Sequence, residues 1–259
     1  MKKPIATLAL AVLALSAAGG AQPRSRAWEL LRSLVLIPGV SGHEAAVADF
    51  IQKSLPAGLK VQRDAMHNVW FTIGSGTPHV LFVAHLDELG WIVDAITPDG
   101  TVKVKAGGGV LPQTSEARPV VIDTPHGGVP GIIAPRPGYD ARRQENTIPQ
   151  AYNAENFEIV LGTASEKEAR DLGVAEGQPV TIKKTIVDFS PTMMATRAVD
   201  DRAGCAALLD AALRLKGGGL IGKTVTFAWD VREEIGLFGA AELTKVLRPD
   251  YVFAVDTFV

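Results

Sequence analysis

Four short segments of the sequence gather histidine and carboxylate side chains of the kind that bind metals. They are AHLDELG (84–90), VDDRAG (199–204), REEIGLFGA (232–240) and AVDTF (254–258). Carboxylates that lie close together repel one another, so a site that collects several of them needs cations to neutralise their charge. One imidazole among several carboxylates suits divalent ions such as Zn²⁺, Mn²⁺ or Co²⁺. Together the four segments predict a metal-dependent active site.

The spacing within the first segment suggests how its histidine is oriented. His85 and Asp87 stand two positions apart at the end of an apolar run that predicts a strand. Alternate residues of a strand point to the same side. Asp87 can therefore accept the second N–H of the His85 ring and fix which ring nitrogen faces a metal. The adjacent Glu233 and Glu234 also fit an ordinary solvated helix start, so the metal interpretation depends on all four segments meeting.

The elements that must position these segments alternate between apolar strands and helices. Strands are predicted from residue 79, over 223–231 and over 250–258, and helices over 45–55, 200–215 and 237–247. Ser41 and Glu44 are expected to form a capping box before the first of these helices. The alternation favours an α/β fold with a mostly parallel sheet flanked by helices. Ligands of such sheets bind at the carboxyl ends of the strands, where three of the four segments fall.

Residues 89–191 have a different pattern, with short β-like runs separated by glycine and proline turns. Ser165 is expected as the N-cap of one short helix among them. This stretch predicts a small β-rich, barrel-like domain inserted into the α/β domain, which would comprise residues 24–88 and 192–259. The polar segment 137–156 within the insertion is expected to be a mobile loop.

The first 23 residues have the layout of a secretory signal peptide. Lys2 and Lys3 precede an apolar run too short for a comfortable transmembrane helix, and small residues follow. We expect export to the periplasm or beyond, with no stable membrane insertion after signal cleavage. The formal net charge of −2 argues against nucleic acid as a partner. Cys205 is the only cysteine, which excludes an internal disulfide and a cysteine-rich zinc site.

The four motifs, in this order and spacing, resemble those of the M42 aminopeptidases, relatives of glutamyl aminopeptidase in the zinc-peptidase clan. The resemblance covers the chain from about residue 27 to its end and includes the β-rich insertion. It implies that N-terminal residues are cleaved from peptide substrates with two divalent metal ions, zinc first, with cobalt or manganese as alternatives. It also implies homo-oligomers that assemble through the β insertion.

The resemblance assigns a metal-binding role to one residue or more in each motif. His85 would bind one metal and Asp200 would bridge both. Glu234 and Asp256 would bind opposite metals.

Other motif residues would act on these ligands or on the substrate. Asp87 would orient the histidine, and Glu233 would be the general base. Asp201 would follow its neighbour through a cis peptide bond. Independently of the resemblance, Arg202 follows the aspartate pair, and we expect it to brace the carboxylates.

One departure from the family pattern affects the second metal. Members of the family continue further and supply another histidine ligand near their C-terminus, whereas none of the five histidines here follows Asp256. We therefore expect a C-terminally truncated relative whose second metal lacks a ligand. Such a chain would have an exposed sheet edge and impaired activity.

Other functions compete with this interpretation. The segment GGGLIGKT (217–224) matches the Walker A pattern, but a P-loop needs a strand before it and a helix after it. Here the predicted order is reversed. A catalytically silent, exported binding or assembly module stays open, as does a metal-dependent hydrolase of another amide or of a glycan.

Overall fold

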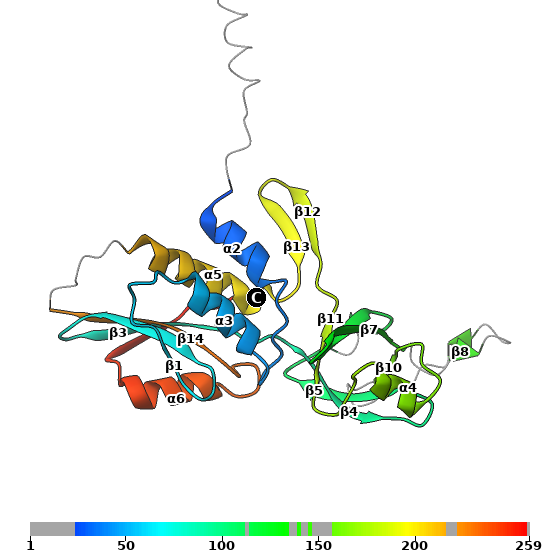
Figure 1. Ribbon diagram of the computed structural model, residues 1–259. Helices are drawn as coiled ribbons and strands as arrows, with labels where there is room; N and C mark the ends of the chain where they lie inside the picture. Colours follow the sequence, from blue (N-terminus) through cyan, green and yellow to red (C-terminus); the bar gives the residue numbers. More distant parts are fainter. Residues whose placement is uncertain are drawn as a thin grey trace, which may run out of the picture.

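Two bodies of different secondary structure lie side by side in the computed structural model of the chain (Figure 1). The structure describes residues 24–111, 114–134, 139–140, 145–146, 157–215 and 222–257. The expected signal peptide over 1–23 lies outside these residues. So does the polar segment 137–156, apart from the short paired strands β8 (Tyr139–Asp140) and β9 (Glu145–Asn146). Within the described ranges, no helix has the length and apolar character needed to cross a membrane.

The first body contains a five-stranded sheet in the order β1-β2-β14-β3-β15. The strands are β1 (Gln62–Arg63), β2 (Val69–Gly74), β3 (His79–His85), β14 (Thr224–Asp230) and β15 (Tyr251–Ala254). β14 and β15 run parallel to β3, whereas β2 is antiparallel to β14 and β1 to β2. The expected mostly parallel sheet is therefore a mixed one. Residues 75–78 are too few for the crossover helix that a parallel return requires, so β3 runs opposite to β2.

Helices cover both faces of this sheet (Figure 1). α2 (Arg26–Leu34), α3 (Ala45–Ser54) and α5 (Val199–Arg214) lie on one face, and α6 (Phe238–Leu247) lies on the other. Successive residues of β2 point to opposite faces of the sheet. Phe71 therefore packs in the core on the α5 side, and Trp70 packs with Leu243 of α6 in the core on the other side. The segment GGGLIGKT follows α5 and leads into β14, which is the opposite order to a P-loop.

The second body is a closed six-stranded barrel in the order β10-β5-β4-β11-β6-β7. Its strands are β4 (Gly90–Ile96), β5 (Val102–Gly107), β6 (Pro119–Thr124), β7 (Gly127–Ile133), β10 (Glu158–Val160) and β11 (Pro179–Ile182). Helix α4 (Glu166–Asp171) begins after Ser165, whose side chain accepts a hydrogen bond from the Glu168 N–H, as expected for its N-cap. Inside the barrel, the rings of Trp91 and Phe157 pack edge to face, with their centroids 5.8 Å apart.

A β-hairpin connects the barrel back to the first body. It consists of β12 (Ile186–Ser190) and β13 (Met193–Thr196), and it leads directly into α5. The hairpin stands beside α2 (Figure 1), where the Arg32 guanidinium donates to Asp188 at 2.5 Å. The hairpin therefore fixes the approach of the chain to Asp200.

Candidate metal centre

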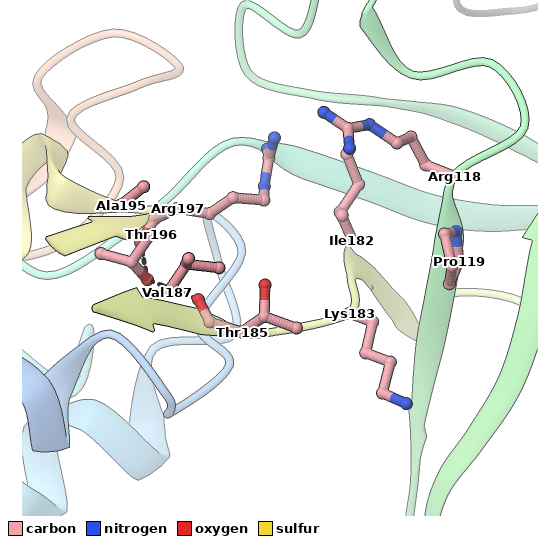
Figure 2. A pocket seen from close by; sticks show the side chains of 9 residues that line it. All are labelled: Arg118, Pro119, Ile182, Lys183, Thr185, Val187, Ala195, Thr196 and Arg197. Atoms are coloured by element: carbon pink, nitrogen blue, oxygen red, sulfur yellow. Dashed lines mark hydrogen bonds between the residues drawn. The ribbon is translucent and has the colours of Figure 1, made fainter. Parts of the chain in front are cut away.

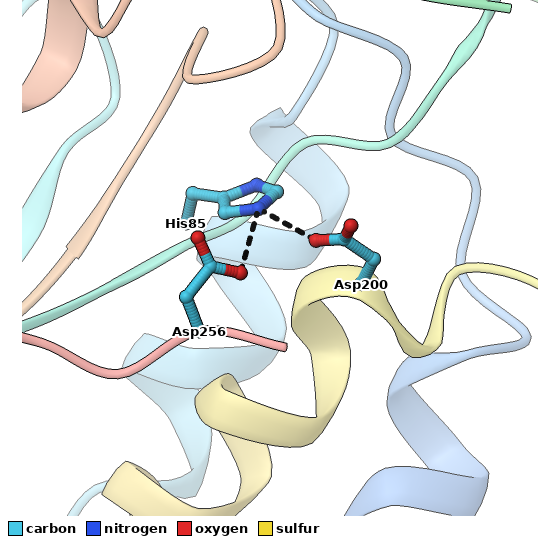
Figure 3. A group of neighbouring side chains, drawn as sticks. All are labelled: His85, Asp200 and Asp256. Carbon is cyan, nitrogen blue, oxygen red and sulfur yellow. Dashed lines mark hydrogen bonds and ion pairs between the residues drawn. The ribbon is translucent and has the colours of Figure 1, made fainter. Parts of the chain in front are cut away.

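Three side chains from different elements meet at the carboxyl end of β3 (Figure 3). His85 is the last residue of β3, Asp200 lies in the first turn of α5, and Asp256 follows β15. His85 Nε2 lies 3.1 Å from Asp200 Oδ1 and 3.8 Å from Asp256 Oδ1. Each residue offers one ligand atom, and the three atoms lie within 4.8 Å of one another. A zinc ion about 2.0–2.2 Å from each nitrogen or oxygen ligand would hold them at comparable separations, so the donor set fits such an ion.

Asp87 holds the histidine from behind and also organises the third motif. Its carboxylate is fully buried and lies 3.4 Å from His85 Nδ1, which leaves Nε2 facing the other carboxylates. It accepts hydrogen bonds from the backbone N–H groups of Glu233 and Glu234 at 3.0 and 3.1 Å. The Ser41 hydroxyl donates to it at 2.6 Å. One carboxylate thus links the first motif to the REEIG turn.

The two glutamates of this turn occupy different environments. The Glu233 carboxylate lies 3.9 Å from His85 Nε2 and its side chain keeps 29% exposure. Glu234 is further from the histidine group and does not belong to the three-residue cluster found among the described residues. Its Cβ lies beside the end of β5, because a Cβ at Gly108 would approach the Glu234 Cβ to 3.3 Å. The structure therefore brings Glu233, but not Glu234, within 4 Å of the imidazole.

The site carries an excess of negative charge. Burial lowers the pKa of His85, but Asp87, Asp201 and Glu233 outweigh it and raise the pKa to about 10. Burial raises the pKa of Asp201 and of Glu234 to about 7 in each case, and neighbouring carboxylates add to this effect while His85 opposes it. The pKa of Glu233 is raised for the same reasons. A site that raises the pKa of acids and of a base together attracts cations, whether protons or metal ions.

The start of α5 is shaped by the aspartate pair. The peptide between Asp200 and Asp201 is cis, as the motif led us to expect. Asp201 does not belong to the three-residue cluster, and its Oδ1 accepts the Gly204 N–H at 2.9 Å. A Cβ at Gly204 would come within 2.4 Å of this carboxylate, so the glycine of the motif is sterically required. The pair thus directs one carboxylate to the site and uses the other to begin the helix.

Sequence patterns missed two contributors to the site. Ser41 does not cap α3, because Glu44 occupies the N-cap and accepts instead from the Gly42 and Arg232 N–H groups. The Ser41 hydroxyl donates its hydrogen bond to Asp87 instead. Lys184, which follows β11, forms a buried ion pair with Glu88.

Glu88 itself resembles a metal ligand in sequence but is turned away from the cluster. It accepts the Gly39 N–H at 3.1 Å and lies 3.9 Å from the fully buried Arg202 guanidinium. Arg202 also donates to the Leu34 carbonyl at 3.2 Å. The arginine therefore contacts Glu88 and the end of α2 rather than the aspartates beside it. Strand alternation could have predicted the direction of Glu88, since position 88 is out of phase with positions 85 and 87.

Known proteins are similar to this chain in sequence and in fold. The family model described as M42 glutamyl aminopeptidase matches residues 67–259. The lysyl aminopeptidase of Pyrococcus furiosus is 30% identical over 234 residues, covering 88% of this chain and 66% of that protein. The glutamyl aminopeptidase of Lactococcus lactis is 27% identical, with the same coverage of 88% and 66%. The chain thus spans somewhat less than two thirds of the length of these curated relatives.

Solved structures give the same picture. The TET1 peptidase of Pyrococcus horikoshii, described as assembling into a tetrahedron or a large octahedral shell, superposes with a TM-score of 0.81 at 32% identity, covering 90% of this chain and 69% of that one. A dodecameric PhTET1 structure gives a TM-score of 0.80 at 31% identity, with coverage of 91% and 69%.

Proposed function

We propose that this chain, which belongs to the M42 glutamyl aminopeptidase family, is a metal-dependent aminopeptidase that releases N-terminal residues from peptides. The observation that carries the proposal is the convergence of His85, Asp200 and Asp256 at one sheet edge, with Asp87 fixing the imidazole. The relatives named as lysyl and glutamyl aminopeptidases support it.

We propose two divalent ions, with zinc as the first choice and cobalt or manganese as alternatives, and the described residues provide a three-ligand group for one of them. His85, Asp200 and Asp256 supply ligand atoms that lie close together. Glu234, with a pKa raised to about 7 by burial, supplies a further carboxylate nearby. When bound, such ions provide Lewis-acid activation of water and of the scissile carbonyl.

Glu233 is the residue that we assign to proton transfer. It would take a proton from the attacking water and return one to the leaving amine, as a general base and then a general acid. Burial and nearby carboxylates raise the pKa of Glu233 and bring it closer to neutral pH. An acid–base catalyst is most effective when its pKa lies near the pH at which it works. Its partial exposure leaves it open to substrate. Because its N–H is held by Asp87, its position is fixed through the backbone.

We further propose assembly and export for this enzyme. The inserted barrel, residues 89–191, would form the contacts of a homo-oligomer, in line with the dodecamer and the shells described for the similar TET structures. The N-terminal segment would direct the chain to the periplasm or the medium. Peptides would be the substrates.

The test is release of chromophore from aminoacyl p-nitroanilides by the purified protein supplied with zinc, cobalt or manganese. Glu233→Gln should lower kcat by about 10²- to 10⁴-fold, the usual contribution of a general base. Glu242→Gln is a matched control, because Glu242 lies on the surface of α6 and pairs with Lys245. Absence of release by the wild type, or equal release by Glu233→Gln, would overturn the proposal.

A further inference from the structure

A cavity of about 340 Å³ lies between the barrel and the hairpin (Figure 2). Pro119 of β6 and Ile182 of β11 form its barrel side, and Val187 of β12 faces them from the hairpin. Two arginines also line it, Arg118 immediately before β6 and Arg197 immediately after β13, and the rest of the lining comes from Lys183, Thr185, Ala195 and Thr196. The cavity therefore combines an apolar wall with a cationic end.

The two guanidinium groups gather at the same end of the cavity in Figure 2. Burial lowers the pKa of Arg197 and the positive charge of Arg118 lowers it further, while Glu88 opposes both effects. The bond formed by the Arg118 side chain goes to a neutral acceptor, from Nε to the Thr114 carbonyl at 3.2 Å. Within the described ranges, neither arginine has a carboxylate within ion-pair distance.

The acid whose charge reaches Arg197 is already engaged elsewhere. Glu88 is paired with Lys184, accepts the Gly39 N–H and lies 3.9 Å from Arg202. One carboxylate thus faces three positive groups at this junction. Positive charge is left over at the cavity, and an anion would neutralise it.

We propose that this cavity binds a small organic carboxylate, held by Arg118 and Arg197, with its apolar portion against Pro119, Ile182 and Val187. The planar guanidinium matches a carboxylate in a two-point arrangement. The apolar wall favours an acid with a hydrocarbon chain over a fully hydrated inorganic ion. Free amino acids with apolar side chains belong to this class. The proposal goes beyond the aminopeptidase function and does not depend on it.

The test is isothermal titration of the full chain, with its metals, against 4-methylpentanoate at low ionic strength. This probe lacks an amino group, and 4-methylpentanamide is the matched neutral ligand. We expect the acid to bind and the amide not to. Arg118→Gln and Arg197→Gln should each weaken binding by about 10-fold or more, the usual loss for a hydrogen bond to a charged group. Added NaCl should weaken it too.

Lys103→Gln is the control, because Lys103 is an exposed cation on β5 and does not line the cavity. It should bind the acid as the wild type does. Wild-type affinity in both arginine variants would place the acid elsewhere, including at the metal centre, and would overturn the proposal. Equal binding of acid and amide, or binding of inorganic phosphate as tight as that of the acid, would overturn it as well. Peptide release by Arg118→Gln is measured in parallel, so that failure here is distinguished from failure of the proposed catalysis.

Discussion

Replacement of Asp87 by asparagine should loosen the metal centre while changing few atoms. The carboxylate is fully buried and accepts from the Ser41 hydroxyl and from two backbone N–H groups, besides facing His85 Nδ1. An amide keeps one acceptor oxygen and places an NH₂ group where the other oxygen was. At least one donor then faces another donor, and the charge that holds the imidazole is gone.

The size of the effect follows from these contacts. A hydrogen bond to a charged group contributes about 1.5–3 kcal/mol, and an unpaired buried donor costs about 1–3 kcal/mol. We therefore expect Asp87→Asn to lower the free energy of unfolding by about 3–5 kcal/mol, which corresponds to a fall in Tm of about 10 °C. Loss of the partner that orients a metal-binding histidine should lower metal affinity by about 10- to 100-fold.

Two assays measure this prediction. Thermal denaturation with and without EDTA gives the stability of the metal-bound and metal-free protein, and competition with a chromophoric chelator gives metal affinity. Asp94→Asn is the matched control, since this exposed carboxylate on β4 lies 3.6 Å from Lys105 and should change stability by less than about 1 kcal/mol. If Asp87→Asn melted at the wild-type temperature and kept wild-type metal affinity, Asp87 would not orient His85.

Substitutions at three further residues probe the surroundings of the site. Ser41→Ala should lower the free energy of unfolding by about 1.5–3 kcal/mol in urea denaturation, because it removes the donor 2.6 Å from Asp87; an unchanged midpoint would contradict this. Lys184→Met should cost about 3–5 kcal/mol by the same measurement, because it leaves Glu88 buried with the more distant Arg202, and Lys184→Arg should recover part of the loss. Burial raises the pKa of Asp230 to about 7, so the folded chain holds a proton that the unfolded chain releases near pH 3.8. Stability should therefore fall as pH rises from about 4 towards 7, less steeply in Asp230→Asn, and parallel pH profiles would refute this assignment.

The parts of the site that could be predicted were those governed by local periodicity. Alternation along the predicted strand placed Asp87 beside His85, although β3 itself ends at His85. Asp256 reaches the histidine because β15 runs parallel to β3. The family motif supplied the direction of Asp200, which periodicity could not give.

Contacts made by returning loops could not be predicted. Ser41 reaches Asp87 because the loop before α3 runs beside β3, with Val40 bridged to Glu88. Its spacing to Glu44 matched a capping box equally well, and only the tertiary contact decided between the two uses. The order of the strands was hidden for a similar reason, because β14 enters between β2 and β3 from more than a hundred residues away.

The attachment of the barrel has a consequence for how this architecture can vary. The chain enters the barrel along β4 and leaves along β11, and these strands are hydrogen-bonded neighbours with Trp91 opposite Val180. Both crossings therefore occur at one place, just after Glu88 and just before Lys184. A whole domain can be exchanged, enlarged or lost at this junction while the strand that ends at His85 keeps its course. Assembly and catalysis, as proposed here, could then evolve at separate rates within one polypeptide.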